Sequence, residues 1–439
     1  MEKYDPELTI IMHHGSERLT SSWELENIGR LLVITSYDMT FSRRSPHFIP
    51  TILHKIEWDR IICDECHLIR NSGCKRTLGV WNLSGGIRWG LTGTPIHNGE
   101  SDFVNLFRFH QYSIDYIVNN LNDLKERYTL RRTKNSIGGD LDLPGLDIQI
   151  HKIDFSSEEE REFYRRVRGE VREEFNRLQN MRFNMTAIFE LLMRSRQSCI
   201  YPQMVIDGYN KKYDTEIDNW QGSVSKIQKI ADMIKGQSNQ MENRSDRTLV
   251  FSYFKDEMRL LKNYLCRLGY NVATIDGSVS LSERENILNR CQFDLSKFND
   301  SQLGILPDDV LKIIMSYYNP VDVLIVQINT GSTGLNLQMF NHVYFTSPCW
   351  NPAIEDQAIC RSYRLGQKKP VNVHKLVMYD SQDDENQTIE EKIISIQEKK
   401  RKIMSNILND PDLLNNGIYK DVKGVANRLT VEDFMYMLG

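Results

Sequence analysis

The chain has 439 residues, of which 40% are hydrophobic and 26% are charged, a globular balance that excludes a wholly disordered protein. Its 55 Lys and Arg residues against 59 Asp and Glu residues give a net charge of −4, so any polyanion that binds must meet a local basic patch. No apolar run approaches the roughly 20 residues that span a bilayer, and eight scattered cysteines favour a reducing, intracellular compartment.

Short apolar runs rich in β-branched residues alternate with helical stretches along most of the chain. This alternation predicts an α/β fold of parallel sheets covered by helices. The predicted strands are residues 9–12, 31–36, 60–63, 88–91, 248–252, 271–275, 323–328, 342–345 and 371–377. Helices are predicted between many of them, for instance over residues 256–268 and 282–291.

The stretch from residue 156 to about residue 198 has a helical pattern instead. Ser157 and Glu160 have the spacing of a capping box at its start. Apolar residues then recur every three or four positions, and most of the remaining face is Arg and Glu: the apolar stripe is Phe163, Val167, Val171, Phe175 and Leu178. This segment is therefore predicted to be a helical subdomain between two α/β blocks.

The run IICDECH, residues 61–67, places two carboxylates at the end of an apolar strand. Ligands of open α/β sheets bind at the carboxyl ends of the strands. There, Asp64 could hold Mg²⁺, and Glu65 could orient or deprotonate a water for phosphoryl transfer. Taken alone, the pair is equally compatible with a solvated acidic strand end.

A second strand ends in the turn GLTGTPIHN, residues 90–98, and this turn begins 25 residues after Glu65. Its hydroxyl residues Thr92 and Thr94, which flank Gly93, could hydrogen-bond the groups of the first motif. They could then relay the state of a bound nucleotide.

Together, Asp64-Glu65-Cys66-His67 and Leu91-Thr92-Gly93-Thr94-Pro95 resemble motifs II and III of superfamily-two helicases, specifically the Swi/Snf-type DNA translocases. LRRTK at residues 130–134 resembles the signature that follows the first lobe in this family. The helical segment after residue 154 then resembles the family's protrusion.

The second block carries further segments of the same resemblance. TGSTGLNLQMFNHVYFTSPCWNP, residues 330–352, resembles motif V, in which Gly331 and Gly334 would allow close approach to a phosphate. QAICRSYRLGQ, residues 357–367, resembles motif VI and supplies Gln357, Arg361 and Arg364. The two arginines are three residues apart, so on a helix they would share one face and neutralise charge on a transferring phosphoryl group.

The resemblance implies two RecA-like lobes with parallel sheets, the first incomplete at its N-terminus, and a helical protrusion between them. The expected parts are lobe 1 (1–134), protrusion and linker (135–235), lobe 2 (236–387) and a brace helix with tail (388–439). In the brace, Ile389, Ile393, Ile396 and Ile403 fit an apolar face, and residues 399–402 form a basic end. That basic end is expected to be a solvated face, with contact to DNA phosphates as the alternative.

The phosphate-loop pattern G-x-x-x-x-G-K-[ST] occurs nowhere in the 439 residues. By resemblance, the chain begins partway through the first lobe, which should leave strand edges and apolar helix faces uncovered. Three explanations stay open: a separate polypeptide that docks here and supplies the loop, a split gene, or a degenerate protein that binds without hydrolysing.

Two other features, an insertion in the second block and a C-x-x-C pair in the first, each allow a functional and a simpler structural interpretation. A helical insertion is expected at about residues 295–321, and within it residues 303–320 weakly resemble the start of an F-box. A short amphipathic helix that packs on the second lobe is the favoured alternative. Cys63 and Cys66 have C-x-x-C spacing beside His67, but no second ligand pair follows, so zinc chelation is not expected.

The resemblance implies an ATP-dependent motor that uses ATP and Mg²⁺ and tracks the backbone of double-stranded DNA. Asp64 would hold Mg²⁺, and Glu65 would position the water. His67, Thr92 and Thr94 would couple the site to DNA, and Gln357, Arg361 and Arg364 would complete it. The competing hypothesis is a DNA- or protein-binding remnant without ATP turnover, or one half of a split motor. The nucleus, or another DNA-containing compartment, is the expected location.

Overall fold

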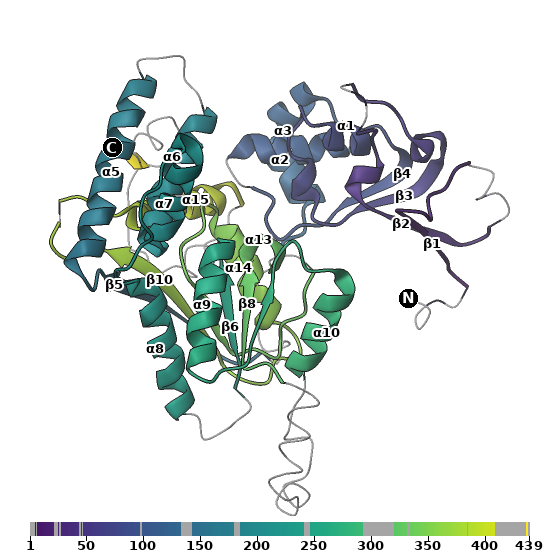
Figure 1. Cartoon of the computed structure of the whole chain (residues 1–439). Helices are drawn as coiled ribbons and strands as arrows, with labels where there is room; N and C mark the ends of the chain where they lie inside the picture. The colour runs from purple at the N-terminus through teal and green to yellow at the C-terminus, as the bar shows by residue number, and fades with distance from the viewer. Residues whose placement is uncertain are drawn as a thin grey trace, which may run out of the picture. The chain divides into compact units, whose positions relative to one another are not determined.

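The computed structural model describes residues 5, 7–21, 25, 28–43, 45, 47–96, 99–132, 143–179, 185–240, 246–292, 320–331, 334–383, 385–408 and 436–437. The chain divides into two compact units (Figure 1). Unit 1 comprises residues 1–133 and 402–429, and unit 2 comprises residues 134–401 and 430–439. Nearly all of the expected insertion, including residues 303–319 of the F-box-like segment, lies outside the described residues, as do Thr133 and Lys134.

Unit 1 contains two separate two-stranded parallel sheets, β1–β2 and β3–β4, with short helices around them. The four strands predicted in this part of the chain are confirmed. The elements are β1 (Thr9–His13), β2 (Leu31–Thr35), η2 (Tyr37–Met39), η3 (Ile52–Lys55), β3 (Glu57–Cys63), η4 (Cys66–Ile69), α1 (Lys75–Trp81), β4 (Ser84–Gly90), α2 (Glu100–Phe109) and α3 (Ile114–Tyr128).

The core of unit 1 lies against one side of its strands. Side chains alternate between the two faces of a strand, so Ile61 and Cys63 of β3 point into the core with Val80 of α1 and Phe109 of α2. Between them, Ile62 points the other way and is 60% exposed. The sheets of unit 1 are therefore covered by the described residues on one face only.

Unit 2 is built on a six-stranded, wholly parallel sheet in the order β5-β10-β9-β6-β8-β7. This sheet confirms the predicted fold class. The elements are β5 (Leu146–Asp154), α5 (Glu158–Gln179), α6 (Met185–Ile200), α7 (Pro202–Tyr213), α8 (Ser225–Gln240), β6 (Thr248–Ser252), α9 (Lys255–Arg267), β7 (Val272–Ile275), α10 (Leu281–Gln292), β8 (Val323–Gln327), α13 (Ile328–Gly331), β9 (His342–Phe345), α14 (Pro352–Ser362), β10 (Val371–Tyr379) and α15 (Ile389–Leu408).

Helices cover both faces of this sheet. On one face, Ile287 of α10 and Ile359 of α14 pack with Leu249 and Phe251 of β6. Helices α8 and α9 contact the strands from the other face. Because both faces are covered, every residue of β6 is buried, and its sequence TLVFS has no alternation of polar and apolar residues.

Strand β5 lies in the range that was expected to be protrusion and linker, and that expectation is wrong for these residues. β5 pairs in parallel with β10 at the edge of the sheet, from Leu146↔Val371 to Asp154↔Tyr379. Edge strands face solvent along much of their length, so LDIQIHKID alternates apolar and polar residues and lacks the apolar run of a central strand.

The predicted helical segment after residue 156 is confirmed, and its apolar stripe from Phe163 to Phe175 is buried. Its capping box is only half formed. The Glu160 N–H donates to Ser157 Oγ at 3.3 Å, but the Glu160 carboxylate accepts from Ser225 N at 3.1 Å at the start of α8. The Glu160 side chain thereby joins the first turns of α5 and α8. In a complete capping box it would instead accept the Ser157 N–H at the start of its own helix.

Helix α15 carries the predicted apolar face, since Ile389, Ile393 and Ile396 are buried in unit 2. Beyond Arg401 the helix belongs to unit 1, where Ile403, Met404 and Ile407 join the core of α2 and α3.

The prediction of a solvated basic end on α15 is wrong for two of its residues. Arg401 is 3% exposed and forms a bidentate pair with Asp356 at 2.8 and 2.9 Å, and Lys400 Nζ donates to the Trp350 carbonyl oxygen at 2.8 Å. No helix among the described residues is long and apolar enough to cross a membrane.

Candidate nucleotide site

Asp64 and Glu65 directly follow strand β3, where the chain reverses into the short helix η4. Glu65 has φ 50° and ψ 46°, the left-handed region that residues other than glycine rarely occupy. The Asp64 side chain is exposed, and its Oδ1 accepts the Glu65 N–H at 3.0 Å. Such backbone strain is typical of functional sites, so this turn is the first structural sign of one.

His67 connects this turn to the second motif. Its Nδ1 lies 3.2 Å from Glu65 Oε2, 3.0 Å from Thr92 Oγ1 and 3.5 Å from Thr94 Oγ1. The imidazole is almost fully buried, at 9% exposure. One ring nitrogen thus contacts three oxygens, with hydrogen bonds to the two threonine hydroxyls and an ion-pair distance to the Glu65 carboxylate.

The backbone holds the same two segments together. Leu91 N donates to the Cys63 carbonyl oxygen and Cys66 N donates to the Leu91 carbonyl oxygen, each at 2.8 Å, which extends the β3–β4 pairing past the strand ends. Thr94 N donates to Thr92 Oγ1 at 3.1 Å and closes the turn. The hydrogen bonds predicted between the two motifs are therefore present, and Gly93 between the threonines faces open space.

Two residues of this site were not anticipated from the sequence. The Tyr37 hydroxyl donates to the Asp64 carbonyl oxygen, and Arg70 Nη1 donates to the His67 carbonyl oxygen at 2.8 Å. Burial raises the pKa of Tyr37 far above its usual value, so the phenol stays a donor. The available signal was that Tyr37 follows the end of strand β2, as Asp64 follows β3.

Cys63 and Cys66 belong to the core of unit 1 rather than to the surface. Both are buried, and burial raises the pKa of Cys63 to about 11 and that of Cys66 to about 12. They are therefore neutral thiols at physiological pH. No group of three potential metal ligands occurs within the described part of the chain.

The candidate residues of unit 2 gather around α14. Gln357 and Arg361 are four residues apart on this helix and share a face. The Arg361 carbonyl oxygen accepts Leu337 N at 3.1 Å, and Gln367 Nε2 donates to the Gln338 carbonyl oxygen at 2.9 Å. These bonds bring together the two segments that resemble motifs V and VI.

The prediction that Arg361 and Arg364 share one helix face is wrong. Helix α14 ends at Ser362, so Arg364 lies beyond it in an exposed turn that Gly366 permits with φ +95°. Gly334 likewise has a positive φ of +76°, with no atom where a Cβ would stand, and Gly331 is the last residue of α13.

Within each unit taken by itself, the candidate residues fit a magnesium nucleotide in part. Mg²⁺ prefers carboxylate oxygens, and the exposed Asp64 carboxylate offers one at the end of a parallel strand. In unit 2, the open space beside Gly334 leaves room for a phosphate to approach its backbone. The sequence contains no phosphate loop, so these residues alone do not form a cradle for the triphosphate.

Comparison with known proteins gives the class of this chain. The SNF2-related domain family matches residues 1–204, and the helicase conserved C-terminal domain family matches residues 225–302 and 303–366. A parallel α/β fold with an Asp-Glu-x-His turn beside a Thr-x-Thr turn agrees with both matches, and the two matches together give the class, a helicase-like ATPase. The chain belongs to the Swi/Snf family of superfamily-two ATPases.

Individual relatives are distant but extend along nearly the whole chain. Transcription termination factor 2 of Drosophila melanogaster is 24% identical over 95% of this chain and 48% of its own length. The human helicase-like transcription factor is 24% identical over 91% of this chain and 48% of its own length. The chain thus spans about half the length of these relatives. Among solved structures, the Sulfolobus solfataricus SWI2/SNF2 ATPase core in complex with dsDNA is 20% identical with a TM-score of 0.40, over 99% of this chain and 82% of that one.

Proposed function

We propose that this chain acts as an ATP-dependent translocase on double-stranded DNA, of the Swi/Snf type. The observation that carries the proposal is the position of His67, whose Nδ1 lies 3.2 Å from Glu65 and 3.0 Å from Thr92. This position joins the acidic turn after β3 to the hydroxyl turn after β4, as coupling between the two motifs requires.

Each candidate residue has one role in this proposal. Bound ATP with Mg²⁺ would supply the phosphoryl group, and Asp64 would hold the metal. Glu65 would orient the attacking water. His67 would couple Glu65 to Thr92 and Thr94 through its hydrogen bonds to the two hydroxyl groups. Gln357, Arg361 and Arg364 would contribute from unit 2, where the guanidinium groups offset negative charge. Contacts to DNA would be to phosphates, so little sequence preference and a strong salt dependence are expected.

The test is duplex-stimulated ATP hydrolysis by the purified chain, alone and mixed with a polypeptide that carries G-x-x-x-x-G-K-[ST]. Replacing Glu65 by Gln should reduce the rate by about 10²-fold or more, because general-base assistance is lost. Glu57→Gln is the matched control, since Glu57 is exposed at the opposite end of the same strand. A wild-type rate no greater than that of Glu65→Gln would show that the chain by itself is not a motor.

The second candidate is a DNA- or protein-binding remnant without turnover. This version predicts duplex binding that does not change on addition of ATP. A split motor predicts instead that hydrolysis appears once a polypeptide carrying G-x-x-x-x-G-K-[ST] is added. Residence in the nucleus is part of the first proposal, because relatives of this chain are named as transcription factors.

A further inference from the structure

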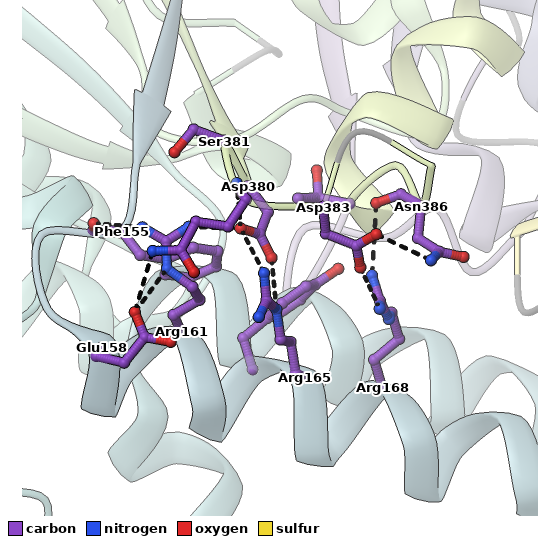
Figure 2. A network of polar contacts seen from close by, with 12 residues as sticks. Phe155, Glu158, Arg161, Arg165, Arg168, Asp380, Ser381, Asp383 and Asn386 are labelled. Carbon is purple, nitrogen blue, oxygen red and sulfur yellow. Dashed lines mark hydrogen bonds and ion pairs between the residues drawn. The ribbon is translucent and has the colours of Figure 1, made fainter.

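Helix α5 carries four arginines on one face, Arg161, Arg165, Arg168 and Arg172, at spacings of four, three and four residues. The first three form ion pairs with the segment that follows β10 (Figure 2). Asp380 accepts from both Arg161 and Arg165, with 2.8 Å between Arg165 Nε and Asp380 Oδ2. Arg168 Nη2 lies 2.7 Å from Asp383 Oδ2.

The fourth arginine, Arg172, lies one helical turn beyond Arg168, which pairs with Asp383. Arg172 forms no ion pair with any residue that the structure describes. Lys392 of α15 is close to it and half-buried. Burial lowers the pKa of Lys392, and the neighbouring Arg168 and Arg172 lower it further. Two cations therefore stand together where an anion would relieve their repulsion.

A cavity of about 150 Å³ opens at this place. Its described lining contains four cationic side chains, two side-chain amides and no carboxylate: Arg165, Arg168, Arg172, Lys392, Asn386 and Gln387. Apolar residues such as Val171 and Ile389 complete the wall. A cavity of about this volume accommodates a ligand as large as benzene, so a single phosphate group fits.

We propose that this cavity binds the phosphate group of a small phosphorylated ligand, held by Arg172 and Lys392. Arginine offers a planar fork that matches phosphate, and lysine adds a compact charge. The site shares no residue with the candidate nucleotide site. A recess that admits one phosphate suits a small ligand better than a duplex, whose phosphates run along a continuous convex surface. The bound group would link α5 to the first turn of α15.

Phosphate binding by the purified chain tests this proposal. Inorganic phosphate and inositol hexakisphosphate would be titrated separately by calorimetry, with thermal unfolding as a second measurement. Binding should be measurable at millimolar phosphate and should weaken with added salt. Similar affinity for the two probes would identify a simple phosphate site, and much tighter binding of the second would identify a polyphosphorylated metabolite.

Arg172→Gln and Lys392→Gln should each weaken phosphate binding by about tenfold or more, the loss of one charge-assisted hydrogen bond. Without ligand, both variants should be at least as stable as the wild type, because a repulsion is removed. Lys392→Arg should retain binding. Arg177→Gln is the matched control, on the same helix but paired with Glu174 and outside the cavity.

Two results would overturn the proposal. One is phosphate affinity in Arg172→Gln and Lys392→Gln that equals the affinity of the wild type. The other is a loss of duplex DNA affinity in these two variants as large as their loss of phosphate affinity, which would assign the cations to a DNA surface.

Discussion

The strands of the two units differ in what covers them, although both units pair their strands in parallel. In unit 2, Leu324 of β8 and Val250 of β6 are completely buried, because helices lie on both faces of the sheet. In unit 1, Ile62 of β3 and Trp89 of β4 are 60% and 57% exposed on the face opposite the core. Parallel sheets are normally covered on both faces. In unit 1, the described residues leave one apolar face of the sheet exposed to solvent.

The uncovered face of unit 1 bears on the phosphate loop, whose sequence pattern the chain lacks. Met12 and Ile34 on the β1–β2 pair are exposed in the same way, at 45% and 40%. Two-stranded parallel sheets also leave unpaired edges to which a further strand can add. We propose that a segment carrying the phosphate loop covers this face, whether it belongs to this polypeptide or to a separate one.

The largest expected effect on stability concerns a fully buried ion pair within unit 2. Lys226 of α8 and Glu390 of α15 are both fully buried, with Lys226 Nζ 2.6 Å from Glu390 Oε1. Lys226→Met leaves a buried carboxylate without its partner, so the free energy of unfolding of unit 2 should fall by roughly 3–5 kcal/mol. Urea unfolding measures the loss.

The matched control for this variant is Lys229→Met, an exposed lysine on the same helix, which should change the free energy by less than about 0.5 kcal/mol. An equal, small effect of both variants would mean that the buried pair does not hold α8 to α15.

The second prediction compares the two sheets directly. Leu324→Ala in β8 should destabilise unit 2 by about 2–5 kcal/mol, because it opens a cavity in a closed core. Ile62→Ala in β3 should cost less than about 0.5 kcal/mol, because the side chain is already in solvent. Equal losses in urea unfolding would show that the outer face of β3 is covered in solution.

The third prediction concerns pH and a histidine group on the sheet of unit 2. His374 lies 3.0 Å from His151, stacks on His342, and burial lowers its pKa to about 4. The folded state therefore binds fewer protons than the unfolded state below pH 6.5, and stability is lost as the pH falls from about 6.5 toward 4. The loss should reach at most about 3 kcal/mol.

His374→Gln should flatten the dependence of unit 2 stability on pH in that range, measured by urea unfolding at several pH values. An unchanged slope in the variant would contradict this assignment. His110 of unit 1 also has a pKa lowered by burial, so a smaller dependence of the same sign is expected there.

The smallest effect on stability is expected at the open face of unit 1. Ile62→Ser combined with Trp89→Ser should leave the free energy of unfolding within about 0.5 kcal/mol of the wild type. The pair should nevertheless reduce concentration-dependent self-association in analytical ultracentrifugation, since exposed apolar faces and edges promote it. Unchanged association would show that this face does not act as a contact surface.

The sequence predicts the strands of both units well, because their apolar runs are short and rich in β-branched residues. It misses β5, since an edge strand with polar alternation resembles a loop or linker. The bonds from His67 to Thr92 and Thr94 follow from neighbouring strand ends and could be predicted. The position of Arg364 beyond the end of α14 could not be predicted. It depends on the hydrogen bonds from Gln367 to the carbonyl oxygens of Gln338 and Phe340, which are distant in the sequence.

The central claim is that this chain supplies all of a DNA-driven ATPase except the phosphate-loop segment, which the open face of unit 1 receives. The most direct measurement is duplex-stimulated ATP hydrolysis by the chain mixed with a polypeptide carrying that segment. The account predicts that hydrolysis appears on mixing, is lost with Glu65→Gln and is weakened by Ile62→Ser with Trp89→Ser. Hydrolysis that remains absent on mixing, although the two polypeptides bind each other, would contradict it.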